Sequence, residues 1–130
     1  MKIFDGQNAV LGRLASYAAK EALKGEEVAV LNCDLVRVSG NQANIQERFK
    51  QSRRRGGTIQ RGPKISKLSY KIVKKTIRGM LPNHRIGRGR EALKRIKCYS
   101  GVPPEFENSE KITFKDTKLK KFMNVEDLGK

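Results

Sequence analysis

The chain has 130 residues and carries 29 Lys and Arg against 13 Asp and Glu, a formal net charge of +16. A chain of this length fits one domain with its own core, so neither a disulfide nor a metal is required for folding. It contains no run of about 20 apolar residues, which argues against a membrane-spanning helix, and its first residues lack the apolar stretch of a signal peptide. We therefore expect a cytoplasmic protein whose charge is neutralised by a polyanion, either nucleic acid or an anionic membrane surface.

The positive charge is confined to one segment. Residues 48–97 hold 18 basic residues and one acid, Glu91, a net of +17, whereas the remainder holds 11 basic and 12 acidic residues. A solvated surface usually mixes both signs. A generally lysine-rich surface predicts an even spread, so the sequence favours a polyanion-binding surface within residues 48–97.

The first third of the chain predicts a strand, a helix and a second strand. Residues 2–4 form the expected first strand, and Asn8 lies where a helix cap is expected. A helix over 11–23 follows from apolar residues at helical spacing, namely Leu11, Leu14, Ala15, Ala18, Ala19, Ala22 and Leu23. Gly25 ends this helix, and the unbroken apolar run 28–33 predicts a strand covered on both faces, as in a parallel sheet.

The next segment predicts a second helix. Residues 35–38 either continue the preceding strand or form a separate one. Asn41 is the expected cap of a helix over 41–53, which turns Ile45 and Phe49 toward the core.

A basic loop over 53–62, predicted to be mobile, precedes the helix with the clearest functional pattern. This helix is expected over 64–81, beginning after Pro63 and ending near Gly79 and Pro82. One face is cationic and consists of Lys64, Lys67, Lys71, Lys74, Lys75 and Arg78. The opposite face is apolar and consists of Ile65, Leu68, Ile72, Val73, Ile77 and Met80. We expect the apolar face to pack on the sheet and the cationic face to meet the polyanion.

The following residues predict a loop, a short helix and a strand. Residues 83–90 are expected to form another basic loop, in which Gly87-Arg88-Gly89 is a flexible turn that lets arginines approach an anion. Residues 91–93 suggest a short helix. The alternation over 94–99 predicts a strand with Ile96 and Cys98 on one side.

Strands that alternate with helices predict an α/β layer fold with a mainly parallel sheet. Residues 1–104 are expected to form the single domain. Residues 105–130 are expected to be a polar extension that Ile112 and Phe114 attach to the body. The extension also contains basic residues able to reach a phosphate surface, namely Lys118, Lys120 and Lys121.

No catalytic, nucleotide-binding or metal-binding pattern is present in the sequence. The glycines after the first strand match neither G-x-G-x-x-G nor the P-loop. His84 is the only histidine and has no carboxylate near it in sequence. A cluster of carboxylates would require folding to bring together three acids that are distant in sequence, namely Asp5, Asp34 and Glu47. Cys33 and Cys98 follow no metal-ligand spacing and are expected to be reduced, buried thiols. We expect no cofactor, no metal and no small-molecule substrate.

Aromatic residues make up 6% of the chain, with no Trp, and Tyr70 is the only aromatic residue between Phe49 and Lys97. Proteins that read single strands usually stack bases on aromatic side chains. The composition instead favours folded RNA recognised through backbone and shape, with Lys and Arg on phosphates. The predicted RNA-binding residues are Lys50, Arg53, Arg54, Arg55, Arg61, Lys64, Lys67, Lys71, Lys74, Lys75, Arg78, Arg85, Arg88 and Arg90.

Four motifs occur in order along the chain: Gly12-Arg13-Leu14-Ala15-Ser16, Val38-Ser39-Gly40, Arg78-Gly79-Met80-Leu81-Pro82 and Tyr99-Ser100-Gly101-Val102-Pro103. With these motifs nearly the whole chain resembles the large-subunit ribosomal protein thirteen family in its archaeal and eukaryotic form. The resemblance implies a three-layer α/β/α domain with a parallel four-stranded sheet. It also implies binding to large-subunit ribosomal RNA early in assembly, neighbouring ribosomal proteins as further partners, and no catalytic activity.

Two other classes of function stay open at this point. An RNA-modifying or nucleotide-using enzyme on the same fold predicts a carboxylate or metal cluster at the strand ends. A DNA-binding or membrane-surface protein would use the same positive charge, and competition between structured RNA, duplex DNA and anionic vesicles distinguishes these cases.

Overall fold

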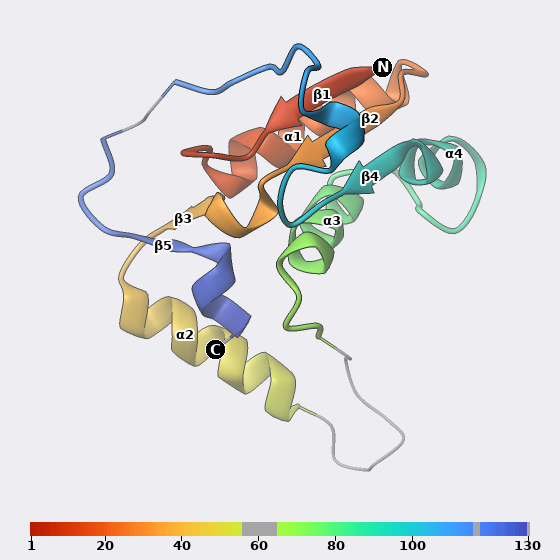
Figure 1. The fold of residues 1–130 in the computed structure, drawn as a ribbon. Coiled ribbons are helices and arrows are strands. Elements are labelled where there is room, and N and C mark those ends of the chain that lie inside the picture. The colour runs from red at the N-terminus through yellow and green to blue at the C-terminus, as the bar shows by residue number, and fades with distance from the viewer. Residues whose placement is uncertain (56–64, 116–117, 130) are drawn as a thin grey trace.

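The computed structural model describes residues 1–55, 65–115 and 118–129 (Figure 1). The strands in chain order are β1 (Lys2–Asp5), β2 (Val28–Leu31), β3 (Arg37–Ser39), β4 (Ile96–Cys98) and β5 (Phe122–Asn124). The α-helices are α1 (Leu11–Leu23), α2 (Gln42–Arg54), α3 (Ser69–Gly79) and α4 (Gly87–Arg95). Three 3₁₀ turns complete the list: η1 (Cys33–Leu35), η2 (Pro104–Phe106) and η3 (Val125–Gly129). Strand and helix alternate from β1 to β2, three consecutive helices separate β3 from β4, and the β1-β2-β4 sheet is parallel, which confirms the α/β class.

The described residues form one parallel sheet and one separate antiparallel ribbon. The parallel sheet has the order β1-β2-β4, with Lys2 opposite Val28 and Val28 opposite Ile96. The ribbon pairs β3 with β5, so residues 37–39 are a separate strand. The expectation of a mainly parallel sheet is therefore confirmed, whereas the four-stranded sheet and the three layers implied by the resemblance are not.

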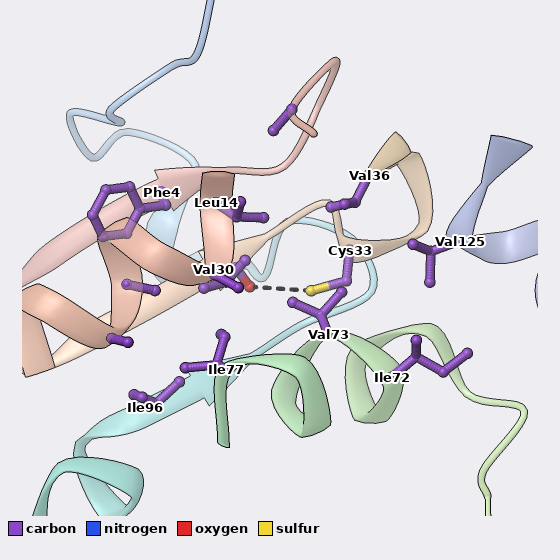
Figure 2. Close-up of a cluster of buried hydrophobic side chains, with 14 of the residues drawn as sticks. Phe4, Leu14, Val30, Cys33, Val36, Ile72, Val73, Ile77, Ile96 and Val125 are labelled. Carbon is purple, nitrogen blue, oxygen red and sulfur yellow. Dashed lines mark hydrogen bonds between the residues drawn. The ribbon is translucent and has the colours of Figure 1, made fainter. Parts of the chain in front are cut away.

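One face of the parallel sheet carries the main core. Val28 and Val30 of β2 point to this face, together with Ile96 of β4. Helix α1 covers it with the alanine-rich stripe predicted from the sequence, and α3 covers it with Ile72, Val73 and Ile77, all of which are buried. Figure 2 shows Val73 and Ile77 of α3 directed toward the strands and Ile72 on the side of Val125. Small alanine side chains allow α1 to approach the sheet closely.

The other face of the sheet carries a smaller apolar cluster. Ile3, Ala29 and Leu31 are buried there beneath Phe106 of η2. Because successive residues of a strand point to opposite faces, β2 needs apolar residues at all four positions to fill both clusters. All four residues of β2 are buried, which confirms a strand covered on both faces. The predicted strand over 28–33 is wrong at its end, because Asn32 has φ +54° and Cys33 begins η1.

The expected helix over 64–81 is wrong at its start, because α3 begins at Ser69. Leu68 is extended, with φ −76° and ψ 128°, and its N–H donates to the hydroxyl of Ser66 at 3.1 Å. A Ser hydroxyl that accepts a nearby backbone N–H stabilises a turn at the expense of a helix. The apolar face is also narrower than predicted, since Leu68 is 48% exposed and Met80 is 44% exposed.

The expected flexible loop over 83–90 is also wrong in its second half. Helix α4 begins at Gly87, whose φ of +62° turns the chain into the helix. Gly89 is buried, and a Cβ atom there would lie 2.1 Å from the carbonyl oxygen of Pro82 and 2.4 Å from that of Asn83. The second glycine therefore serves close backbone packing and gives no flexibility.

Two of the three predicted helix-end residues, Asn41 and Gly25, are confirmed, and Asn8 is not. Asn41 caps α2 as expected, since its side chain accepts from the N–H of Ala43 at 3.0 Å. Gly25 ends α1 with φ +100°. Asn8 does not cap α1: it has φ +61°, and its side-chain oxygen accepts from Arg37 at 2.7 Å. Asn tolerates the left-handed conformation, so Asn8 forms a turn before the helix.

The C-terminal residues contribute more to the core than a polar extension would. Ile112 exchanges backbone hydrogen bonds with β1, and Phe114 stacks on Phe4 with ring centroids 5.9 Å apart, which confirms that these two residues attach the extension. Farther on, Met123, Val125 and Leu128 are buried in the main core. Figure 1 shows the turn η3 beside α2.

Candidate nucleic-acid interface

A groove of about 640 Å³ lies between α2 and α3. Its lining comes from α2, from α3 and from the extended segment before α3, and consists of Arg48, Phe49, Ser52, Ile65, Ser66, Lys71, Ile72, Lys75, Thr76, Arg78 and Gly79. Two elements that are separated along the chain therefore form one concave surface. All of these lining residues lie within the basic segment, residues 48–97.

Helical spacing explains the chemistry of this groove. Ile72 and Ile77 of α3 are buried against the sheet, so Lys71, Lys75 and Arg78 are on exposed positions of the same helix. On α2, Ile45 is buried and Phe49, one turn later, is half-buried. Those spacings place apolar side chains at the bottom of the groove and cations at its rim.

The rim carries four cations, Arg48, Lys71, Lys75 and Arg78, all on exposed residues. Among the residues that the structure describes, no acid lines the groove. Four like charges around a recess with apolar walls create a positive potential that attracts phosphate groups. The groove is therefore the strongest candidate for polyanion binding in the described part of the chain.

The structure places the other predicted residues of α2 and α3 in varied surroundings. Lys50, Arg54 and Arg55 are exposed near the end of α2, and Lys67 is exposed just before α3. Lys74 is half-buried rather than fully exposed. Arg61 and Lys64 lie outside the described residues.

Arg53 has a structural contact that the sequence did not predict. Its guanidinium donates a hydrogen bond to the backbone carbonyl of Leu128, and its Nε atom is buried. The side chain therefore ties α2 to the C-terminal residues.

A second group of cations lies on and before α4. Arg85, Arg88 and Arg90 are exposed, and the N–H of Arg85 donates to the side-chain oxygen of Asn83 at 3.1 Å. None of the three lines the α2–α3 groove. Glu91, the acid of the basic segment, is exposed and lies 3.9 Å from Lys94. Such an exposed pair contributes at most about 1 kcal/mol to folding.

The fold also brings acids toward the basic segment. Turn η3 packs against α2, and it contains Glu126 and Asp127. Glu47 on α2 accepts from Gln51 at 3.4 Å. The fold therefore places acidic residues of other segments beside α2.

Sequence reasoning did not single out Arg48, Phe49 or Ile72 as ligand-facing. Arg48 begins the basic segment, so the charge count did contain a signal for it. Phe49 and Ile72 were expected to face the core, and each does so while also lining the groove. A one-dimensional pattern assigns a residue to one face, whereas a residue at the edge of a face belongs to both.

An enzyme on this fold would carry its carboxylates or metal at the strand ends. Asp5 accepts from Asn32 at 2.9 Å and from the N–H of Gln7 at 3.0 Å, so it holds the turns after β1 and β2 together. Within residues 1–55, 65–115 and 118–129, no three His, Cys, Asp or Glu residues come together in a way that suits a metal ion. In the same ranges no helix is long and apolar enough to cross a bilayer.

The two cysteines form a contact inside the core. Cys33 is buried, Cys98 is half-buried, and both thiols are free. The hydrogen bond with Cys98, together with burial, raises the pKa of Cys33 far above that of an ordinary thiol. The neighbouring Cys33 side chain lowers the pKa of Cys98, with burial opposing this effect and Lys74 adding to it.

Comparison with known proteins identifies the family. Residues 1–105 match the family described as ribosomal protein L13. The chain is 41% identical over 121 residues to the large ribosomal subunit protein uL13 of Methanosarcina barkeri, an alignment that covers 92% of this chain and 85% of that protein. It is 36% identical to the uL13 of Methanocaldococcus jannaschii over 100% of this chain and 96% of that protein. It is also 37% identical to the uL13 of Spodoptera frugiperda, over 85% of this chain and 54% of that protein. The chain therefore belongs to the ribosomal protein L13 family.

Proposed function

We propose that this chain is a non-catalytic structural constituent of the large subunit of the cytoplasmic ribosome, where it binds and stabilises large-subunit ribosomal RNA during assembly. The observation that carries the proposal is membership of the family, with relatives named as large-subunit proteins that align along most of this chain. The groove between α2 and α3 supports it, because its rim has the charge that an RNA backbone requires.

The proposed RNA contacts are of two kinds. Lys71, Lys75 and Arg78 would bind phosphates at the groove, joined by Arg48. The arginines on and before α4 would form a second contact, together with the exposed cations near the end of α2. Arg61 and Lys64 stay in the proposal as cations of the basic segment. Neighbouring ribosomal proteins are proposed as further partners.

Two finer features of the fold are also proposed. Ile112 forms a parallel bridge with Phe4 at the free edge of β1, which supports residues around Ile112 as a fourth position of the sheet. The η2 turn over the second face supports a third layer. Residues 1–104 as the domain and 105–130 as its extension likewise remain a proposal.

Co-sedimentation tests the ribosomal assignment. A tagged copy of the chain, produced in cells of a related organism, is expected to sediment with large subunits and with assembled ribosomes on a sucrose gradient. A protein that remains at the top of the gradient at low salt would contradict the assignment. Washing the particles with high salt should release other weakly bound basic proteins first.

The affinity for RNA should depend steeply on salt. If about 6–10 phosphates are neutralised, binding to a large-subunit RNA fragment should weaken roughly 10³–10⁵-fold between about 50 and 200 mM salt, taking duplex DNA as the guide. Duplex DNA and anionic vesicles serve as competitors at matched salt. Either competitor displacing the RNA fragment at equal phosphate concentration would favour the DNA-binding or membrane alternative.

A further inference from the structure

The α2–α3 groove combines two kinds of surface that a phosphate alone does not require. The rim is cationic, whereas Phe49, Ile65 and Ile72 give the interior an apolar lining. The apolar walls strengthen the potential that attracts a phosphodiester to the rim. The charged group itself does not fill the apolar interior, since burying an ion away from water costs free energy. The apolar recess therefore needs an occupant with an apolar surface of its own.

Hydroxyl groups also line the recess. The hydroxyl of Ser66 accepts from the N–H of Leu68 at 3.1 Å, so its own proton is available as a donor. The hydroxyl of Thr76 donates to the carbonyl of Ile72 at 3.1 Å, so its lone pairs are available as acceptors. One donor and one acceptor beside an apolar wall suit a planar heterocycle with polar edges.

The size of the recess agrees with such an occupant. Its volume of about 640 Å³ lies within the range of roughly 300–1,000 Å³ typical of small-molecule sites. Nucleotides in RNA loops and bulges present unstacked bases that proteins hold by apolar and edge contacts. We propose that the groove receives one unstacked nucleobase of the bound RNA, with the flanking phosphates on the cationic rim. This inference rests on the proposed function and adds a base-binding site to a surface expected to bind backbone alone.

Small ligands test the groove directly. The probes are AMP, CMP, GMP and UMP, compared with ribose 5-phosphate and inorganic phosphate, each titrated into isotope-labelled full-length protein and followed by NMR. At least one nucleotide is expected to bind about fivefold or more tightly than ribose 5-phosphate, which is the lower end of what one base contributes. The amide signals of Phe49, Ile72 and Thr76 should shift with the nucleotide and not with phosphate. Equal affinities, or shifts confined to other elements, would overturn the inference.

A substitution that fills the groove distinguishes binding of a base from binding of the RNA backbone. Ser52 is half-buried on α2 and lines the groove, so Ser52→Phe adds bulk there without changing charge. Gln46→Phe places the same side chain on an exposed position of α2 outside the groove lining and is the matched control. Ser66→Phe, in the extended segment before α3, is the second filling variant in case Ser52→Phe does not fold.

The filled variant should lose the preference for nucleotides over ribose 5-phosphate. It should also bind a large-subunit RNA fragment about fivefold more weakly, with an unchanged salt slope, whereas Gln46→Phe should behave as the unmodified chain. If the unmodified chain binds RNA and the filled variant binds equally well, the groove inference fails and the proposed function stands. If the unmodified chain does not bind the RNA, the proposed function itself fails. A poly-glutamate peptide that displaces the nucleotides at equal charge would show that the groove takes acidic protein segments and would also overturn the inference.

Discussion

Gly89 is packed closely against backbone atoms at a position where the sequence predicts a flexible turn. Helix α4 packs with Gly89 against the backbone of Pro82 and Asn83, where no side chain fits. Gly89→Ala should therefore destabilise the protein by about 1–3 kcal/mol or more, because the clashing atoms belong to the backbone between α3 and α4, which would have to shift. Urea unfolding measures the change.

Gly12→Ala is the matched control for this substitution. Gly12 lies in α1, and a Cβ atom there would have nothing within 4 Å. Alanine has the higher helix propensity, so this variant should be unchanged or more stable by up to about 1 kcal/mol. A similar loss of stability in both glycine variants would show that close packing is not the cause at Gly89.

The two thiols should differ in their reactivity. The thiolate is the reactive form of cysteine. The raised pKa keeps Cys33 neutral where an ordinary thiol ionises, whereas the lowered pKa of Cys98 increases its thiolate fraction. Iodoacetamide at about pH 8 should therefore modify Cys98 before Cys33 in the folded protein. Peptide mass spectrometry reads out the order, and in denaturant both cysteines should react alike. Faster modification of Cys33 would contradict the assignment.

At the scale of one element, α3 joins the core to the RNA-binding surface. Its buried isoleucines and valine pack on the sheet, so charge changes on the other face should cost little stability. Lys71→Glu with Lys74→Glu should weaken RNA binding at least about tenfold and reduce the salt slope by roughly 1.4–1.8, as two phosphate contacts require. Filter binding over a salt series measures both quantities.

Lys74 is half-buried, so a charge reversal there can also lower the stability of the fold. If the double variant also loses thermal stability, Lys71→Glu alone retains the test on an exposed residue. The matched control, Lys2→Glu with Lys24→Glu, makes the same change in net charge outside the basic segment. The control should leave the salt slope unaltered. Equal effects of the two double variants would show that net charge alone drives the binding.

At the scale of the whole molecule, the C-terminal residues connect the β3–β5 ribbon, α2 and the main core. Strand β5 pairs with β3, Arg53 donates to the carbonyl of Leu128, and the side chain of Leu128 is buried in the main core. Leu128→Ala should therefore cost about 2–5 kcal/mol of unfolding free energy, the usual range for a buried leucine. Urea unfolding of the full chain measures it.

Leu35→Ala is the comparison for this prediction. Leu35 is 39% exposed on η1, so the same truncation there removes less buried surface and should cost clearly less than Leu128→Ala. If Leu128→Ala also weakens RNA binding, the C-terminal residues position α2 for its ligand. Equal stability losses at the two sites would indicate that the C-terminal residues do not belong to the cooperative core.

The amino-acid sequence by itself determined the elements whose signals are local. The alanine stripe of α1, the four buried positions of β2 and the Asn41 cap depend on spacing within a few residues, and each was predicted. The positive charge of the middle segment was equally visible, because charge is counted without coordinates. Tertiary structure decided the rest, since it depends on residues far apart in sequence. Arg53 donates to the carbonyl of Leu128, and Arg48 lines the same groove as Lys75, only after distant elements have packed. A periodic pattern predicts which side of a helix is apolar. Only the packing of the helices decides which residues at the edge of that side also line a binding groove.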